Sequence, residues 1–229
     1  MPNASRSLFA AVLDDDRARV KDLLKRNPDL CVDVGQTEAR HEPGIAHWIY
    51  VGDTALHIAS AGYRVEIAKM LLSAGANPNS AMNHRLSHPL HYASDGYLEN
   101  PYWNEKRQVA MIRLLLGAGA DIHAPDKNGA TPLHRAVRTR CAAATRCLLD
   151  AGSDATIENK SGSTPFHLAV QNTGRGGSGT DLAKEAQKEI IRSFLSRGVS
   201  ADLKDRKGKS VLDWAKPAAI RDLLQGHST

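Results

Sequence analysis

The chain has 229 residues and a formal net charge of +5 at pH 7, with 41% hydrophobic and 24% charged residues. This composition excludes a disordered chain, and the longest apolar stretches, such as residues 45–51, are far shorter than the roughly 20 residues that span a bilayer. The charge gives only a slight indication of acidic partners, because the basic residues are spread along the chain rather than gathered in one run.

The first residues and the cysteines indicate a location. Residues 1–6 lead directly into a helical pattern, and no secretory signal is visible. Cys31, Cys141 and Cys147 are sparse and odd in number, as is typical of small buried residues in a reducing compartment. We therefore expect a cytoplasmic protein.

Two helices are expected at the start of the chain. Their apolar residues lie within residues 7–12 and residues 20–24. The aspartates at positions 14–16 suit the turn between them and the start of the second helix, where negative charge is favoured by the helix dipole.

Residues 35–51 are longer than the short turn that would suffice before the next helix. Within this stretch two sets of residues alternate: Ile45, Ile49 and Val51 with Ala46, Trp48 and Tyr50. Alternation is the period of an extended strand, so we expect a strand here.

A short phrase returns four times further along the chain. It reads Thr54-Ala-Leu-His57, His88-Pro-Leu-His91, Thr131-Pro-Leu-His134 and Thr164-Pro-Phe-His167. The steps between its histidines are 34, 43 and 33 residues. A period in this range indicates one supersecondary unit that is copied and stacked along the chain.

The cleanest copy shows how the unit folds. Residues 126–129 are a turn signal, because glycine tolerates positive φ without steric cost. Thr131 suits an N-cap, and Pro132 suits the first helical position, where its missing N–H costs nothing. A second helix over about residues 142–150 ends at Gly152. Each unit is thus a helix pair that buries its apolar stripes only against neighbouring units.

These residues resemble the ankyrin-repeat family, whose signature is T-P-L-H-x-A and whose period is 33. Residues 131–136 and 164–169 match the signature, and residues 54–59 and 88–93 are weaker copies. The resemblance implies an all-α fold, an ankyrin-repeat solenoid of about six helix-turn-helix units with short β-hairpin fingers.

The resemblance also implies that residues 1–229 form a single ankyrin-repeat domain, with atypical units at both ends because their outer faces meet water. We expect an N-terminal capping unit at 5–34, an enlarged finger at 35–51, unit 2 at 52–84, unit 3 at 85–126 with an inserted loop at 96–106, unit 4 at 127–159, unit 5 at 160–205 with an inserted loop at 172–185, and a C-terminal capping unit at 206–229.

The repeated residues are expected to hold units together rather than to perform chemistry. In the ankyrin family the phrase histidine forms hydrogen bonds within and between units. The structural signature comprises Thr54, His57, His91, Thr131, Pro132, His134, Thr164, Pro165 and His167. His84, His88 and His91 have a spacing that zinc ligands can have, but His91 belongs to the phrase, so we expect no metal and no cofactor.

The inserted loops at 96–106 and 172–185 indicate where a partner binds, because they depart from the repeat. They are expected to flank the short basic turn of unit 4 and to form a notch with it. The candidate partner-binding residues are Trp48, Tyr50, Tyr97, Tyr102, Trp103, Arg138 and Arg140, of the aromatic and arginine types that dominate interface hot spots. The alternative is that Tyr102 and Trp103 fold back over their own helix ends.

No catalytic motif of a hydrolase or phosphate-binding enzyme is present. The resemblance implies a non-enzymatic protein–protein interaction module, a monomer that binds another protein through its concave face, fingers and inserted loops. One alternative is polyanion or nucleic-acid binding through the basic residues of units 4–6, which aspartates interrupt. The other is a small-molecule sensor or enzyme that uses the aromatic notch.

Overall fold

The computed structural model describes residues 3–35, 40–45, 47–96, 98–174 and 178–226. The α-helices are α1 (Asn3–Leu13), α2 (Arg17–Arg26), α3 (Ala55–Ala61), α4 (Val65–Ser73), α5 (Pro89–Ser94), α6 (Glu105–Gly117), α7 (Pro132–Arg138), α8 (Ala142–Asp150), α9 (Pro165–Ala169), α10 (Asp181–Leu195), α11 (Val211–Trp214) and α12 (Ala218–Gln225). The remaining elements are the 3-10 helices η1 (Pro28–Val32) and η2 (Pro43–Ile45) and the strands β1 (Arg40–Glu42) and β2 (His47–Ile49).

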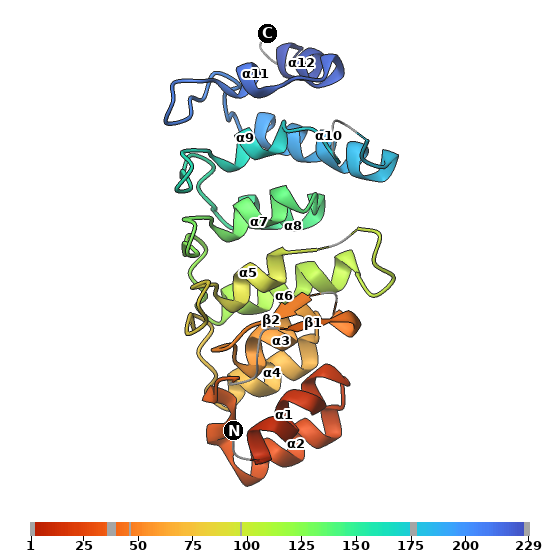
Figure 1. Cartoon of the computed structure of the whole chain (residues 1–229), viewed down its shortest axis with the longest axis vertical. Helices are drawn as coiled ribbons and strands as arrows, with labels where there is room; N and C mark the ends of the chain where they lie inside the picture. Colours follow the sequence, from red (N-terminus) through yellow and green to blue (C-terminus); the bar gives the residue numbers. More distant parts are fainter. Residues whose placement is uncertain (1–2, 36–39, 46, 97, 175–177, 227–229) are drawn as a thin grey trace.

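The helices form consecutive pairs that stack along one axis, with the two ends of the chain at opposite ends of the stack (Figure 1). The first helices of the pairs pack in one row, α3 on α5, α5 on α7 and α7 on α9. The second helices pack in another row, α4 on α6, α6 on α8 and α8 on α10. The all-α ankyrin-type array expected from the sequence is confirmed.

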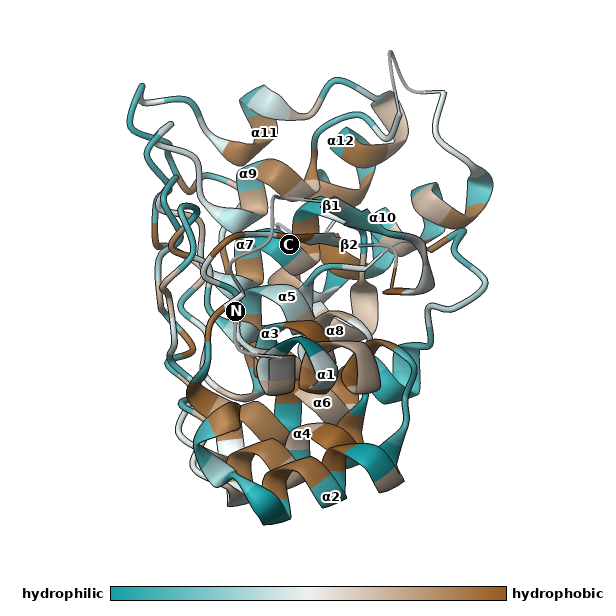
Figure 2. Ribbon diagram, turned by 60° about the horizontal axis from the view of Figure 1, so that its bottom comes forward, coloured by the Kyte–Doolittle hydropathy of each residue, from teal (hydrophilic) through white to brown (hydrophobic). Residues whose placement is uncertain are grey.

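The core lies between the two rows of helices. The third residue of each phrase is buried: Leu56, Leu90, Leu133 and Phe166. Hydrophobic residues occupy the facing sides of the helices, whereas the fingers at one edge are hydrophilic (Figure 2). Burial at the same position in successive units means that each helix pair covers its apolar side chains by packing on its neighbours.

The phrase residues begin each first helix. Thr131 has an extended backbone with φ −80° and ψ 168°, and Pro132 follows at the first helical position. His134 accepts a hydrogen bond at Nδ1 from the Thr131 N–H at 3.1 Å. The same bond links His57 to Thr54 at 3.0 Å. A backbone donor that the helix itself leaves unpaired is thereby satisfied.

The other nitrogen of each phrase histidine reaches the next unit. Because a carbonyl oxygen can only accept, Nε2 carries a proton and donates. The bridges run from His57 to Ser87 O at 3.0 Å, from His91 to Ala130 O at 2.9 Å, from His134 to Ser163 O at 3.1 Å and from His167 to Lys209 O at 3.1 Å. Each imidazole therefore ties a helix start to the finger of the following unit.

Backbone hydrogen bonds also join one finger to the next. The amides of Lys127, Lys160 and Arg206 donate to carbonyls of the preceding finger at 2.7, 2.9 and 3.0 Å. Gly129 and Gly162 have φ values of 72° and 81°, which the tight finger turn requires. The finger edge is thus a continuous hydrogen-bonded ladder.

Two further observations concern helix length and the cysteines. Within the part of the chain that the structure describes, no helix is long and apolar enough to cross a membrane. Cys31, Cys141 and Cys147 are free and buried, and burial raises the pKa of each thiol.

We expect the stability of the stack to fall in mild acid. Burial lowers the pKa of His57, His91 and His134, and that of His91 falls to about 4. In the folded chain the pKa of each of these histidines lies below its value in the unfolded chain, which is about 6.5. The unfolded chain therefore binds protons first as the pH falls from about 6.5 toward about 4, and the free energy of unfolding decreases. For His91 this decrease is about 3 kcal/mol at most. Urea unfolding between neutral pH and about pH 4.5 measures this loss.

A pair of variants tests whether His91 causes this loss of stability in mild acid. His91→Gln should unfold more easily at neutral pH and show a shallower pH dependence, whereas the control His84→Gln changes an exposed residue and should leave the slope unchanged. An intact chain whose unfolding free energy does not change over this pH range would contradict the assignment.

Candidate partner-binding site

The strands β1 and β2 form a two-stranded hairpin that lies over the first helices of units 2 and 3 (Figure 1). β1 pairs antiparallel with β2, with Glu42 opposite His47. Ile45 packs so closely on the turn after α3 that a Cβ at Gly62 would lie 2.7 Å from its Cγ2. The strand predicted over 45–51 is shorter, His47–Ile49, because η2 occupies the residues before it.

His47 anchors the hairpin to α5. Its Nε2 lies 3.4 Å from Asp95 Oδ2, and its ring lies 4.4 Å from the ring of Tyr92. The Tyr92 hydroxyl in turn donates to both carboxylate oxygens of the buried Asp53, at 2.8 and 2.9 Å. The hairpin therefore covers the part of the concave face where Tyr92 would otherwise be exposed.

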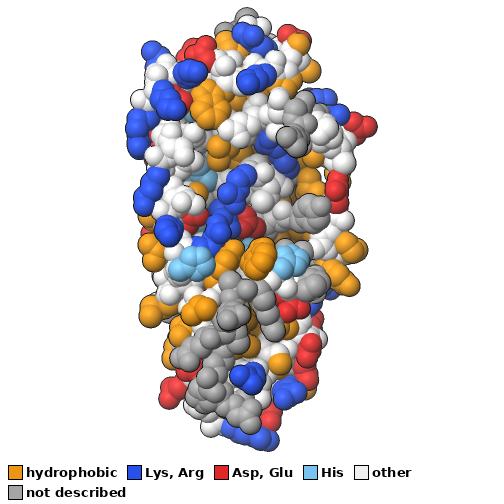
Figure 3. Space-filling model, in the orientation of Figure 1, with side chains coloured by type: hydrophobic (Ala, Val, Ile, Leu, Met, Phe, Trp, Pro, Cys, Tyr) orange, Lys and Arg blue, Asp and Glu red, His pale blue; other side chains and the backbone are white. Residues whose placement is uncertain are grey.

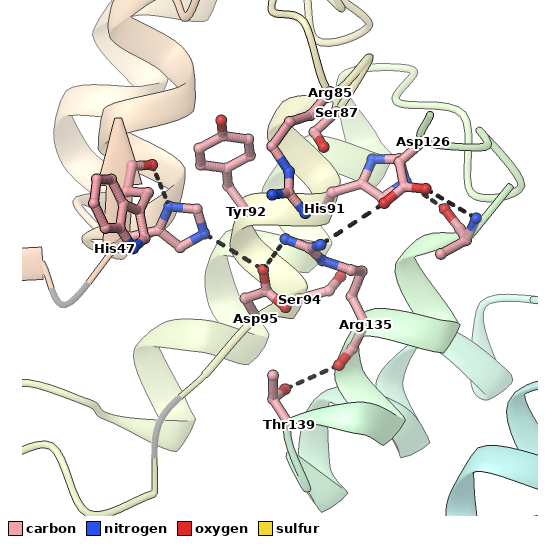
Figure 4. A network of polar contacts seen from close by, with 12 residues as sticks. His47, Arg85, Ser87, His91, Tyr92, Ser94, Asp95, Asp126, Arg135 and Thr139 are labelled. Carbon is pink, nitrogen blue, oxygen red and sulfur yellow. Dashed lines mark hydrogen bonds and ion pairs between the residues drawn. The ribbon is translucent and has the colours of Figure 1, made fainter. Parts of the chain in front are cut away.

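A buried ion pair connects this contact to unit 4 (Figure 4). Arg135 is 5% exposed and donates from Nη2 to Asp95 Oδ2, while its Nη1 lies 3.7 Å from Asp126 Oδ2. Burial opposes ionisation of Asp95, but Arg135 and His47 outweigh it and hold the pKa of Asp95 below its usual range. The hairpin, unit 3 and unit 4 thus share one network of polar contacts.

An open cleft of about 450 Å³ lies between the hairpin and the inserted loop of unit 3. Gly44, Ile45 and His47 form one wall, and Asn100–Asn104 form the other. The floor consists of the ends of α3, α5 and α7, at Tyr63, Asp95 and Arg138. Three arginines line the cleft, Arg64, Arg107 and Arg138, whereas its carboxylate, Asp95, is already paired.

Three of the predicted partner-binding residues line this cleft. Tyr102 is 67% exposed and Arg138 is exposed. Trp103 is half-buried, and its Nε1 donates to Gln108 Oε1 at 3.1 Å, while Gln108 Nε2 donates to Ala93 O at the end of α5. Trp103 therefore covers a helix end, and Tyr102 is presented at the surface.

The other predicted residues lie elsewhere. Trp48 is 48% exposed on β2, and the Tyr50 hydroxyl accepts a hydrogen bond from Arg85 at 3.3 Å. Arg140 donates to the carbonyls of Leu168, Ala169 and Gln171 at 2.8–3.3 Å, so its guanidinium caps the end of α9. Tyr97 lies outside the described residues.

The cleft differs from the predicted notch in one wall. The sequence predicts the loops at 96–106 and 172–185 on either side of unit 4, whereas the hairpin of β1 and β2 faces the first of these loops across the cleft. Loop length shows where extra residues enter, but it does not show in which direction they fold. Contacts of Ile45 and His47 with the first helices set that direction.

The sequence interpretation missed the ion pair between Asp95 and Arg135. One signal was available: the x position of T-P-L-H-x-A holds Ile58, Tyr92 and Leu168 in other units but a charged residue in unit 4. A charge at a repeat position that is otherwise apolar indicates a partner charge nearby, because an unpaired buried charge is costly.

We expect Asp95→Ala to lower the free energy of unfolding by about 3 kcal/mol, because it leaves the buried Arg135 with only the more distant Asp126. Urea unfolding at neutral pH measures the change. The double variant Asp95→Ala, Arg135→Met should recover much of the loss. Equal stability of Asp95→Ala and the intact chain would show that the pair contributes nothing.

Comparison with known proteins agrees with this architecture. Residues 104–179 match a family model of three ankyrin repeats, and residues 51–83 match the model of a single ankyrin repeat. The chain is also similar to alpha-latrotoxin-Lhe1a of Latrodectus hesperus, with 33% identity over 87 residues. This match covers 38% of the present chain and 6% of the length of that protein. Ankyrin repeats typically serve as protein–protein interaction modules. The resemblance seen in the phrase is confirmed: with its repeats matched over residues 51–83 and 104–179, the chain is an ankyrin-repeat protein.

Proposed function

We propose that this protein is a non-enzymatic recognition module that binds another protein at the cleft between the hairpin and the inserted loop of unit 3. One observation carries the proposal: both walls of this open cleft are insertions, and the exposed residues Tyr102 and Arg138 line it. Exposed tyrosine and arginine beside a concavity are typical of interface hot spots.

The chemistry of the cleft favours binding over catalysis. His47 and Asp95 are the acid–base groups that line it, and the two are engaged with each other, while Asp95 also binds Arg135. A carboxylate held ionised by a buried arginine is a poor proton acceptor at neutral pH. These contacts support a positioning role for the two side chains, which hold the hairpin in place.

The walls of the cleft are held before any partner arrives. The hairpin is anchored by His47, and the opposite loop is anchored by Trp103 through Gln108. A surface that is already ordered loses little conformational freedom on association, which favours affinity.

Capture from a native lysate tests the proposal, with quantification of each recovered protein. The double variant Tyr102→Ala, Arg138→Ala should reduce recovery of at least one protein about tenfold or more, since each hot-spot residue contributes about 1–2 kcal/mol or more. The matched control Leu182→Ala, Arg221→Ala changes exposed residues of α10 and α12, and it should recover that protein in the same amount as the unchanged chain.

Thermal unfolding of both variants verifies that they fold. If the cleft variant and its control recover the same proteins in the same amounts, the cleft is not the binding surface.

A further inference from the structure

A second concavity lies between unit 5 and the C-terminal capping unit, and lysines line it. This cleft of about 360 Å³ has Lys207, Lys209 and Lys216 in its lining, together with Gln171, Asn172 and Trp214. We call it the basic groove. All three lysines are exposed, and within the described chain none of their ammonium groups forms an ion pair.

The carboxylates of the basic groove are occupied by local hydrogen bonds. Asp205 is buried and accepts from the backbone amides of Lys207 and Lys209, each at 2.9 Å, and from Trp214 Nε1 at 3.0 Å. Asp213 accepts from the Ser210 amide at 2.8 Å and so caps α11. The negative charges thus stabilise turns, whereas the lysine ammonium groups remain available.

Positive charge continues from the basic groove along the finger edge. Lys127 and Lys160 occupy equivalent positions of two earlier fingers, are exposed, and form no ion pair within the described residues. The backbone ladder fixes their spacing. Lys and Arg side chains line this edge and cross the middle of the face, where Asp and Glu are sparse (Figure 3).

From these observations we infer that the basic groove binds an extended acidic segment of a polypeptide. The inference goes beyond the proposed function, because it assigns a second site and names the chemistry of the ligand that it binds. Carboxylates of such a segment would meet the unpaired lysines, and complementary charge gives specificity and fast association. The exposed amides of Gln171 and Asn172 offer both a donor and an acceptor to a peptide bond.

The same groove is less suited to nucleic acid. Single strands bind by stacking bases on free aromatic rings, but the Trp214 ring is half-buried, has an edge-to-face contact with His167 at 5.4 Å, and is fixed by its bond to Asp205.

Titration followed by NMR tests the inference on the full chain. The probe is a synthetic peptide of four Glu-Ser-Gly units, added to about 1 mM so that weak affinity is detected. The controls are the same peptide with Gln in place of Glu and an oligothymidine of equal length. We expect the acidic peptide to shift the Trp214 indole N–H and the amides of residues 171–172 and 207–216, and the neutral peptide to leave them unchanged.

Charge reversal locates the site. A triple variant of the groove, Lys207→Glu, Lys209→Glu, Lys216→Glu, should bind the acidic peptide about tenfold more weakly or worse. The control triple variant on the exposed face of α2, Lys21→Glu, Lys25→Glu, Arg26→Glu, should bind the peptide as the unchanged chain does. Shifts that are absent, that spread over the whole surface, or that are larger with oligothymidine would overturn the inference. Loss of partner capture on changing Tyr102 and Arg138 would still uphold the proposed function, so the two failures are distinguishable.

Discussion

The architecture depends on a neutral histidine placed between two backbone groups. Nδ1 of each phrase histidine bonds within its own cap, to the backbone amide of Thr54 or Thr131 for example, and Nε2 donates to a carbonyl of the next finger. The same ring thus defines a helix start and its distance from the following unit. Burial lowers the pKa of His57, His91 and His134 and so keeps these three rings uncharged, which the arrangement requires, because a doubly protonated ring could not accept at Nδ1.

The hairpin divides the concave face into a covered part and an open part. It lies on the first helices of units 2 and 3, and the pair Asp95–Arg135 connects its anchor to unit 4. Beyond Arg135 the face is open and carries Arg138 and the basic groove. The hairpin thus covers one part of the face and forms a wall of the proposed cleft beside it.

Much of the fold was predictable because the phrase residues act locally. Thr131, Pro132 and His134 specify a helix start through bonds to their own backbone, so sequence spacing is sufficient to recognise them. The site was less predictable, since it depends on contacts between distant segments. Tyr102 and Arg138 were identified by residue type, but the hairpin as a wall depends on the packing of Ile45 against Gly62.

Three arginines close together in unit 4 show how context decides function. Arg135 is neutralised by Asp95, Arg140 caps α9, and Arg138 is exposed with no ion pair among the described residues. Partial burial, and then repulsion by Arg135, holds the pKa of Arg138 below its ordinary range. A carboxylate from a partner would relieve this repulsion. The cleft and the basic groove therefore favour the same chemistry, since each presents a cation that the fold itself leaves without a counter-ion.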